Sequence, residues 1–570
     1  MHKIHCLLFA FLLLLGPWPD ASAQERGPWE KELHLTSLED LPIQATQRRR
    51  PLLAFARESL LGVHGKLSVE VQGHTLTPME FISSIWLSNY PWEHEPIIPI
   101  RLPSFKEQVG LDPQQRLFAF ADLLNDDAVI GAIDAAQSKS RIQGAELTRE
   151  EREASNLGAR MVAFADLRNG QAFRVVPPLA ESFDESPGAP WAALHQPNLG
   201  NLGQPWEGIF EQLVTAYASA DSADLAAAAA ALAEAQVERG GAYVPEAWRI
   251  QAEHHYLTLH PFRWAWIFCA LTVITLLVTT KRWSSAGYKI AWILAVGAVL
   301  IQIAGFVARM IISSRPPVTN MYESVIWVAF GAVVLGLAME AVHRSRHFLL
   351  AASLVALLSL YLADAQGGGA LDRAINPLQP VLQDNFWLTT HVLTVTLSYA
   401  AFALALGLAH IVIFPAIWKG HTKSVRSLYP YIYRSIQVGV FLLATGVVLG
   451  AFWANYSWGR FWDWDPKETW SLVALLSYLA LLHGRLAGWW GGFGMAIGSV
   501  LGFLTILMAW YGVNFVLGVG LHSYGFGEGG YGLALGFLIF QLALVVVALI
   551  RVSGGNRRTP TTPMANAIAD

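Results

Sequence analysis

Nine long apolar runs dominate the second half of this 570-residue sequence and restrict it to a helical membrane fold. An α-helix needs roughly 20 mostly apolar residues to cross a bilayer, and each run is about that long. Backbone polar groups inside a bilayer must find partners within the protein, so spanning helices are the expected form. The runs lie near residues 264–280, 288–308, 323–341, 347–363, 388–416, 434–453, 470–487, 493–513 and 532–550.

Charge divides the chain into two dissimilar parts. Residues 24–260 carry 32 acidic and 19 basic side chains, whereas residues 261–570 carry 10 acidic and 19 basic ones. We therefore expect a mostly α-helical protein, a polytopic bundle of about nine spans preceded by a signal peptide and a soluble α+β extracytoplasmic domain. No basic patch stands clear of a membrane segment, which argues against a nucleic-acid partner. The expected divisions are a signal peptide at 1–23, the extracytoplasmic domain at 24–260, the membrane domain at 261–551 and a cytoplasmic tail at 552–570.

Two independent features predict the orientation of the chain. The first 23 residues have the parts of a secretory signal: Lys3, an apolar stretch and the cleavage-type triplet Ala21-Ser22-Ala23. An uncleaved anchor is the alternative interpretation. Basic residues are also more frequent in the loops expected inside, including those of Lys281 and Arg344, which follows the positive-inside rule. Both features place residues 24–260 outside the cytoplasm.

The extracytoplasmic part shows short mixed patterns and no catalytic signature. We expect only one or two strands there, because a single stretch alternates clearly and is followed by Gly73, a candidate turn residue. An aspartate before an alanine-rich run is typical of a helix start. The expected elements are a strand at 67–71, a helix at 146–155, a helix at 225–235 preceded by Asp224, and a loop at 176–190.

The chain has two cysteines, and their positions exclude two classes of protein. Cys6 lies in the leader and Cys269 lies in the first long apolar run. The sequence contains no C-x-x-C and no C-x-x-C-H. The protein is therefore neither a C-x-x-C thiol oxidoreductase nor an ordinary c-type cytochrome.

The segment 453–470 is the most informative one, with five tryptophans in 18 residues between two spans. A tryptophan belt at the membrane interface is one interpretation. A belt needs only scattered rings, whereas glycine, proline and five charged residues are interleaved here. Flat apolar faces beside polar tips suit a porphyrin, with Lys467 or Arg460 available to its propionates. The residues that we assign to this site are Trp453, Trp458, Trp462, Trp464, Asp465, Lys467 and Trp470.

Histidines flank this segment on the same predicted side of the membrane. His391 precedes it and His522 follows it in the next outer loop. Neutral imidazole is a common axial ligand of haem iron, so the pair predicts ligation from both faces of the ring. The alternative is two ordinary interfacial histidines. His483 lies roughly 20 Å deeper than Trp470 along its span, and an ionisable group there is a functional candidate. His410 is also expected near the inner side.

Together these motifs resemble the haem-handling WWD family, and within it the CcsA (ResC) subunit of the System II cytochrome c synthase. The core W-G-x-x-W-x-W-D-P-K-E-x-W within 453–470 carries the resemblance. It covers about residues 264–550, and its motifs occur in family order. The supporting segments are 316–324, 386–391, 483–485 and 521–525.

The resemblance implies a function and a set of ligands. His391 and His522 would be the external haem ligands, and His483 one of two intramembrane ligands. Haem b would be both bound ligand and substrate, carried across the bacterial inner membrane and presented for thioether attachment to the CxxCH of apocytochrome c. This is holocytochrome c synthase activity, shared with a ResB (CcsB)-like membrane subunit and supported by thiol-reducing maturation proteins. That partner or His410 would supply the second inner ligand, and no side chain is implied as a covalent or acid–base catalyst.

Three alternatives make different predictions. A haem exporter or chaperone would bind haem but would leave attachment to a separate ligase. A secondary transporter for a non-haem solute would have no Soret band. A structural subunit would use the tryptophans only to anchor a partner.

Overall fold

The computed structural model describes residues 33–142, 147–186, 188–195, 198–279, 284–365, 371–375, 384–420, 422–517, 522 and 530–556. The predicted signal peptide at 1–23 and most of the predicted tail lie outside these ranges. The chain divides into two compact units, Met1–His254 and His255–Asp570.

The first unit combines helices with short antiparallel hairpins, as expected for an α+β region. In its described ranges the strands form three two-stranded sheets, β1-β2, β3-β4 and β5-β6. The strands are β1 Pro42–Ala45, β2 Arg48–Pro51, β3 Val69–Val71, β4 His74–Leu76, β5 Pro96–Pro99 and β6 Leu117–Ala119. The helices are α2 Thr36–Glu39, α3 Leu52–His64, α4 Pro78–Leu87, α5 Pro103–Gln108, α6 Phe120–Leu124, α7 Asp127–Ser140, α8 Arg149–Arg168, α9 Leu199–Leu202, α10 Trp206–Ser219, α11 Ser222–Gly240 and α12 Ala247–Leu259, with single turns η1 Trp92–His94, η2 Ala180–Ser182 and η4 Gly241–Tyr243.

The sequence predicted some of these elements and missed others. The expected hairpin around Gly73 is β3-β4, with Val71 paired to His74. The expectation of one or two strands was too low, because the other strands are only three or four residues long and lack a clear alternation. Asp221, not Asp224, caps the alanine-rich helix α11, since its carboxylate accepts from the backbone N–H groups of residues 223 and 224.

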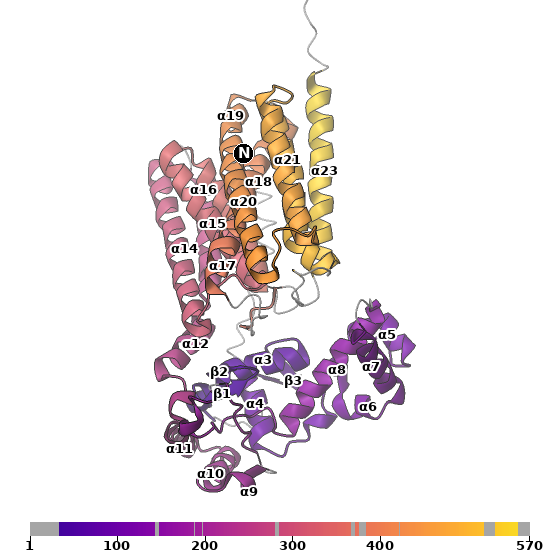
Figure 1. The fold of residues 1–570 in the computed structure, drawn as a ribbon, viewed down its shortest axis with the longest axis vertical. Helices are drawn as coiled ribbons and strands as arrows, with labels where there is room; N and C mark the ends of the chain where they lie inside the picture. The colour runs from indigo at the N-terminus through magenta and orange to yellow at the C-terminus, as the bar shows by residue number, and fades with distance from the viewer. Residues whose placement is uncertain are drawn as a thin grey trace, which may run out of the picture. The chain divides into compact units, whose positions relative to one another are not determined.

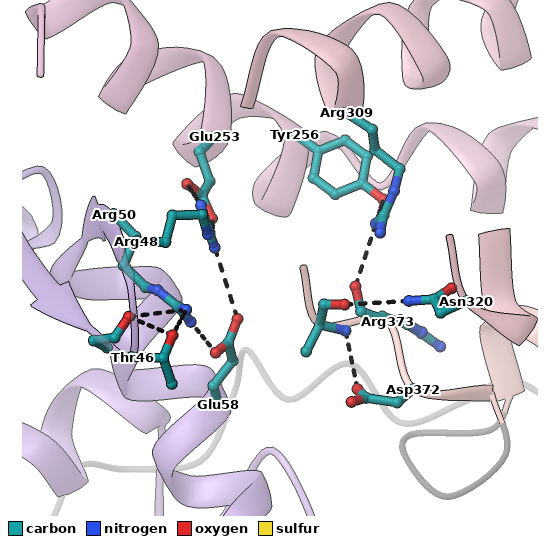
Figure 2. Close-up of polar contacts among 12 residues, drawn as sticks. Thr46, Arg48, Arg50, Glu58, Glu253, Tyr256, Arg309, Asn320, Asp372 and Arg373 are labelled. Atoms are coloured by element: carbon teal, nitrogen blue, oxygen red, sulfur yellow. Dashed lines mark hydrogen bonds and ion pairs between the residues drawn. The ribbon is translucent and has the colours of Figure 1, made fainter. Parts of the chain in front are cut away.

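Ion pairs of two arginines stabilise the first hairpin. Arg50 is 1% exposed and pairs with Glu58 of α3, and its guanidinium also donates to Thr46 Oγ1 at 3.3 Å. Arg48 forms a bidentate pair with Glu253 of α12, at 2.5 and 2.8 Å. Figure 2 shows these contacts around the β1-β2 turn. Because buried charges are costly unless they are paired, these ion pairs hold the hairpin to α3 and α12.

The second unit is a bundle of long apolar helices, which Figure 1 shows running roughly parallel to one another. Nine helices in the described part of the chain are long and apolar enough to cross a membrane, as the sequence predicted. The first span runs from α12 into α13 Pro261–Val278. The others are formed by α14 Ser284–Ser313, α15 Met321–His343, α16 His347–Ala365, η8 Leu388–Val392 with α18 Leu393–Lys419, α20 Tyr429–Trp458, α21 Pro466–Leu486, α22 Gly492–Leu507 with η9 Met508–Leu517, and α23 Tyr531–Asn556. The short helix α17 Asn385–Trp387 precedes η8, and the short helix α19 Lys423–Arg426 follows α18.

Helix α18 lies at the centre of this bundle. It packs against α15, α16, α20, α22 and α23, and most of its apolar side chains are buried. Small residues allow the close approach: a Cβ on Gly439 of α20 would lie 2.6 Å from the ring of Phe402 on α18. Close packing at small residues is typical of membrane helices, where burial of apolar surface does not drive association.

Candidate functional site

A cavity opens among the helix ends of the second unit, and its lining brings together much of the predicted site. Its empty volume is about 1110 Å³, including the solvent space at its mouth. The lining comes from the start of α15, from η8 and α18, from the end of α20, from α21 and from η9. Residues of the predicted site that line it are His391, His522, Trp453, Trp462 and Lys467.

The segment 453–470 is less of a loop than its composition suggests. Trp453 and Trp458 belong to the last turns of α20, and α21 begins at Pro466, so only residues 459–465 connect the two helices. Gly459 ends α20 with a φ of +71°, a left-handed conformation that suits glycine. Glycine and proline therefore mark the helix boundaries, and the tryptophans on either side of them are held by regular backbone.

His391 is fixed by helix α20. It lies in the π-helical segment η8, and its Nδ1 donates to the carbonyl oxygen of Gly446 at 2.8 Å. A carbonyl oxygen can only accept, so Nδ1 carries the proton and Nε2 carries the lone pair in the neutral ring. The ring also meets Trp453 at a centroid distance of 5.5 Å. A Cβ on Gly450 would lie 2.6 Å from its Cε1, so the imidazole lies directly against the α20 backbone.

His522, like His391, is held through its Nδ1, but by a carboxylate. Its Nδ1 lies 2.9 Å from Oδ1 of Asp465, and its ring meets the indole of Trp458 edge-to-face at 5.0 Å. Since the carboxylate only accepts, Nδ1 donates and Nε2 carries the lone pair. Histidine ligands of metals are commonly oriented by such an outer hydrogen bond.

Asp465 has two roles in this geometry. It is the N-cap of α21, because its Oδ1 accepts from the backbone N–H of Lys467 at 2.8 Å, and Glu468 completes a capping box. The same oxygen contacts His522. The motif D-P-K-E therefore encodes both the start of a helix and the orientation of an imidazole that lies 57 residues away.

The basic residues near the cavity differ in their availability. Arg460 pairs with Asp463 at 3.4 Å and with Glu468 at 3.3 Å, and its guanidinium lies 5.6 Å from the ring of Trp458. Lys467 instead lines the cavity. Lys467 is thus better placed than Arg460 to meet an acidic ligand there.

The remaining predicted tryptophans lie away from the cavity lining. Trp464 is 69% exposed with a φ of +57°, and its ring meets Trp462 edge-to-face at 5.9 Å. Trp470 is half-buried on the first turns of α21. An exposed tryptophan in a left-handed backbone conformation is costly, which makes Trp464 a candidate contact for an external molecule.

One wall of the cavity comes from residues that the sequence analysis left out of the predicted site. Val318, Thr319, Asn320, Met321 and Ser324 all line it. They belong to the segment 316–324, whose sequence supported only the family resemblance. The family resemblance of this segment was the only sequence feature that could have indicated a role in the site. Nothing in its composition shows that it lines a cavity.

A buried ion pair holds this wall in place. Glu323 accepts from the guanidinium of Arg309 at 2.6 and 3.0 Å, and its second oxygen accepts from the backbone N–H and the hydroxyl of Thr319. Arg309 also donates to Tyr256 Oη at 2.9 Å and to the carbonyl oxygen of Arg373 at 3.2 Å (Figure 2). Breaking such a buried pair is strongly destabilising, so the wall is rigidly supported.

Two π-helical segments meet at the cavity. The segment η8 contains His391, and η9 contains the lining residues Trp510 and Asn514. Single π-helical turns are often found at functional sites, because the extra residue re-aims side chains on the helix. Sequence periodicity did not predict either segment.

The two histidines that were predicted to lie near the inner side do not line this cavity. His483 is exposed on α21, and its Nδ1 donates to the carbonyl oxygen of Leu479 at 2.7 Å. His410 is half-buried on α18 and stacks on Phe540 of α23 at 6.3 Å. No contact joins His410 to His483 in the part of the chain that the structure describes.

Comparison with known proteins gives a family match within the second unit. Residues 318–522, from the cavity wall to His522, match the model of a family described as cytochrome C assembly protein. The CcsA cytochrome c biogenesis protein of Prochlorococcus marinus is 34% identical over 269 residues, which are 42% of this chain and 84% of that protein. CcsA of a Synechococcus strain is 33% identical over 273 residues, 42% of this chain and 86% of that protein.

A further relative is similar along most of the chain. Protein NrfI of Wolinella succinogenes is 26% identical over 517 residues, which are 86% of this chain. Those residues span 54% of NrfI, so this chain corresponds to about half the length of that relative.

Proposed function

Because the chain belongs to the cytochrome c assembly protein family, we propose that it binds haem b in this cavity and presents it for attachment to apocytochrome c. The family membership makes it a cytochrome c biogenesis protein with several membrane spans. We assign residues 24–260 to the extracytoplasmic domain and residues 261–551 to the membrane domain. On this assignment the cavity opens on the extracytoplasmic side of a bacterial inner membrane.

The paired imidazoles are the observation that carries the proposal. His391 and His522 line one cavity, and each donates from Nδ1 to an oxygen acceptor, so that Nε2 is the ligating nitrogen. This donor set suits haem iron with two axial imidazoles. Among the described residues no group of three or more histidine, cysteine or carboxylate side chains could hold a bare metal ion. Two imidazoles are sufficient when the macrocycle supplies the other ligands.

The rest of the lining also fits a tetrapyrrole. Trp453 and Trp462 supply apolar faces, and the buried indole N–H of Trp453 has no hydrogen-bond partner among the described residues. Lys467 supplies a positive charge for a propionate. Trp458 and Asp465 orient His522 from behind. Large apolar cavities with a few polar groups are typical ligand sites.

The proposed reaction needs positioning more than acid–base catalysis. Each cysteine S–H of a CxxCH peptide adds across one vinyl C=C: sulfur bonds to the carbon next to the ring and hydrogen goes to the terminal carbon. The addition is redox-neutral, and we expect the iron to be in its reduced state. The histidine of CxxCH then replaces one of the two protein imidazoles. Holding haem and thiols together supplies the rate through proximity.

His483 supports a role for a partner subunit. It is exposed in the last turn of α21, so its ring is available at the surface of the bundle. An intramembrane histidine at such a surface is a functional candidate by default. We propose that haem from the inner side is held at His483, with the second ligand from a ResB (CcsB)-like chain; His410 is the internal alternative. Synthase activity would then belong to the pair, with thiol-reducing proteins supplying the reduced apocytochrome.

Absorption spectra of membrane-purified protein test this proposal. We expect His391→Ala and His522→Ala each to lose the bis-imidazole Soret spectrum, and added imidazole to restore it. His343→Ala is the matched control, since this inner-end histidine contacts Arg434 and does not line the cavity. His483→Ala should keep cavity ligation when haem is added from outside. Unchanged ligation and unchanged cytochrome c output in the first two variants would exclude the assignment.

A haem exporter that serves a separate ligase is the alternative within the haem class. The discriminating measurement is thioether-linked haem on a CxxCH peptide after incubation with the purified protein and its partner. Haem binding without thioether formation would favour the exporter. A protein without any Soret band would instead favour a non-haem transporter.

A further inference from the structure

The cavity extends well beyond the paired histidines into the membrane span. Tyr399 lies two helical turns along α18 from His391, which places it about 12 Å deeper. Ser471 lies one turn deeper than Lys467 on α21, and Trp510 of η9 also lines this end. We call Tyr399, Ser471 and Trp510 the cavity floor. We call the end of the cavity at the connection 459–465 its mouth, because Phe461 lines the cavity there and is 52% exposed.

The floor contains a buried hydroxyl that the protein itself does not satisfy. Tyr399 is 2% exposed, and its hydroxyl has no hydrogen bond of normal geometry to any described residue, although Ser471 lies near it. The neighbouring indole is occupied, because Trp510 Nε1 donates to Ser324 Oγ at 2.9 Å. An unsatisfied buried hydroxyl costs free energy unless a ligand or water completes it. The floor therefore has a hydrogen-bond donor for a polar group that enters the cavity.

The chemistry of haem b decides which polar group that is. Its two propionates lie on one edge of the macrocycle and its two vinyl groups lie toward the opposite side. In many haem proteins the carboxylates face water, but here the vinyl groups must meet the thiols of a polypeptide that can approach only through the mouth. This argument rests on the proposed function. If the vinyl edge faces the mouth, then the carboxylate edge faces the floor.

We propose that the floor is a carboxylate subsite that sets the orientation of the bound tetrapyrrole. The Tyr399 hydroxyl donates to one propionate, and Lys467, one turn nearer the mouth, pairs with the other. The Ser471 hydroxyl donates to the carbonyl oxygen of Lys467 at 2.7 Å and lines the subsite beside them. Charge-assisted hydrogen bonds of this kind are the stronger class, and they are stronger still in a low-dielectric site. The subsite directs the reactive vinyl edge toward the mouth and makes free carboxylates a requirement for tight binding.

Haem with esterified propionates tests the subsite separately from iron ligation. Iron protoporphyrin IX and its dimethyl ester have the same iron and vinyl groups, and the ester lacks the carboxylate charge. We expect the wild-type protein to bind the free acid about tenfold or more tightly than the ester. Tyr399→Phe should reduce that ratio several-fold, with the bis-imidazole spectrum retained. Comparing ratios between variants cancels the different partitioning of the two porphyrins into detergent.

Tyr478→Phe is the matched control. Tyr478 is a fully buried tyrosine of α21 that does not line the cavity, so its substitution should leave the ratio unchanged. The subsite is wrong if the wild-type protein binds the free acid and the ester equally, or if Tyr399→Phe folds normally and keeps the wild-type ratio. Failure of the proposed function would look different, since neither porphyrin would then give a bis-imidazole spectrum in the wild-type protein, and that result would overturn the subsite as well.

Discussion

Replacing Gly450 with alanine places a methyl group against the imidazole of His391. The added Cβ would lie 2.6 Å from Cε1 and 3.0 Å from Nδ1 of the ring. Ordinary van der Waals contact begins at 3.4 Å, so the ring must retreat by roughly 0.8 Å. The ring cannot move freely, because its Nδ1 donates to the carbonyl oxygen of Gly446, which lies one turn from Gly450 on α20.

The expected effect is a loss of haem affinity without a loss of fold. Displacing an outer support of a metal ligand typically costs 10- to 100-fold in affinity, and a shift near 1 Å at a reacting centre has a similar cost. Alanine is a better helix former than glycine by about 0.5–1 kcal/mol, so α20 itself should not be weakened. Titration of the purified variant with haem, followed at the Soret band, measures the change.

Gly536→Ala is the matched control for this substitution. Gly536 lies within α23, and an added Cβ there meets no atom within 4 Å. We expect it to bind haem as the wild-type protein does. Added imidazole should restore six-coordinate iron in Gly450→Ala by replacing the displaced ring. Wild-type affinity and spectrum in Gly450→Ala would refute the placement of His391 against α20.

Two further predictions follow from other contacts. Asp465→Asn keeps an N-cap for α21 but removes the negative charge beside His522, so haem affinity should fall several-fold while the melting temperature stays unchanged. Asp465→Ala also removes the N-cap, so it should lower the free energy of unfolding by about 1 kcal/mol as well. In the first unit, burial lowers the pKa of His64, whose Nδ1 donates to the carbonyl oxygen of Ile97 at 2.7 Å. The unfolded chain therefore binds more protons, and stability should fall as the pH drops below about 6.5. His64→Gln keeps a donor and should flatten this dependence in thermal melts of the full chain.

A specific result would contradict each of these two predictions. Equal haem affinity in Asp465→Asn and the wild-type protein would show that the carboxylate does not support His522. The same pH slope in His64→Gln and in the wild-type protein would assign the pH dependence to other groups. The charged neighbours of His64 are Lys66, Arg160 and Glu70, and their substitution is the next step in that case.

The number and type of the membrane elements could be predicted from the sequence alone. Apolar length sets whether a segment can cross a bilayer, and this property is local, so the nine runs correspond to nine candidate spans. The tryptophan motif likewise contains its own local structure: Gly459 ends one helix, and Asp465 with Pro466 starts the next. Local capping was also misplaced once, at Asp224 instead of Asp221, because both aspartates precede the same alanine-rich run.

Only the tertiary structure decided which distant groups meet. The contacts of His391 with Gly446 and of His522 with Asp465 join residues 55 and 57 positions apart, and no periodicity encodes such pairs. The wall at 318–324 and the two π-helical segments depend on helix packing in the same way. Hydropathy determines that a helix enters the membrane, but side-chain packing between helices determines its rotation. That rotation turns His391 toward the cavity and leaves His483 exposed on the surface of the bundle.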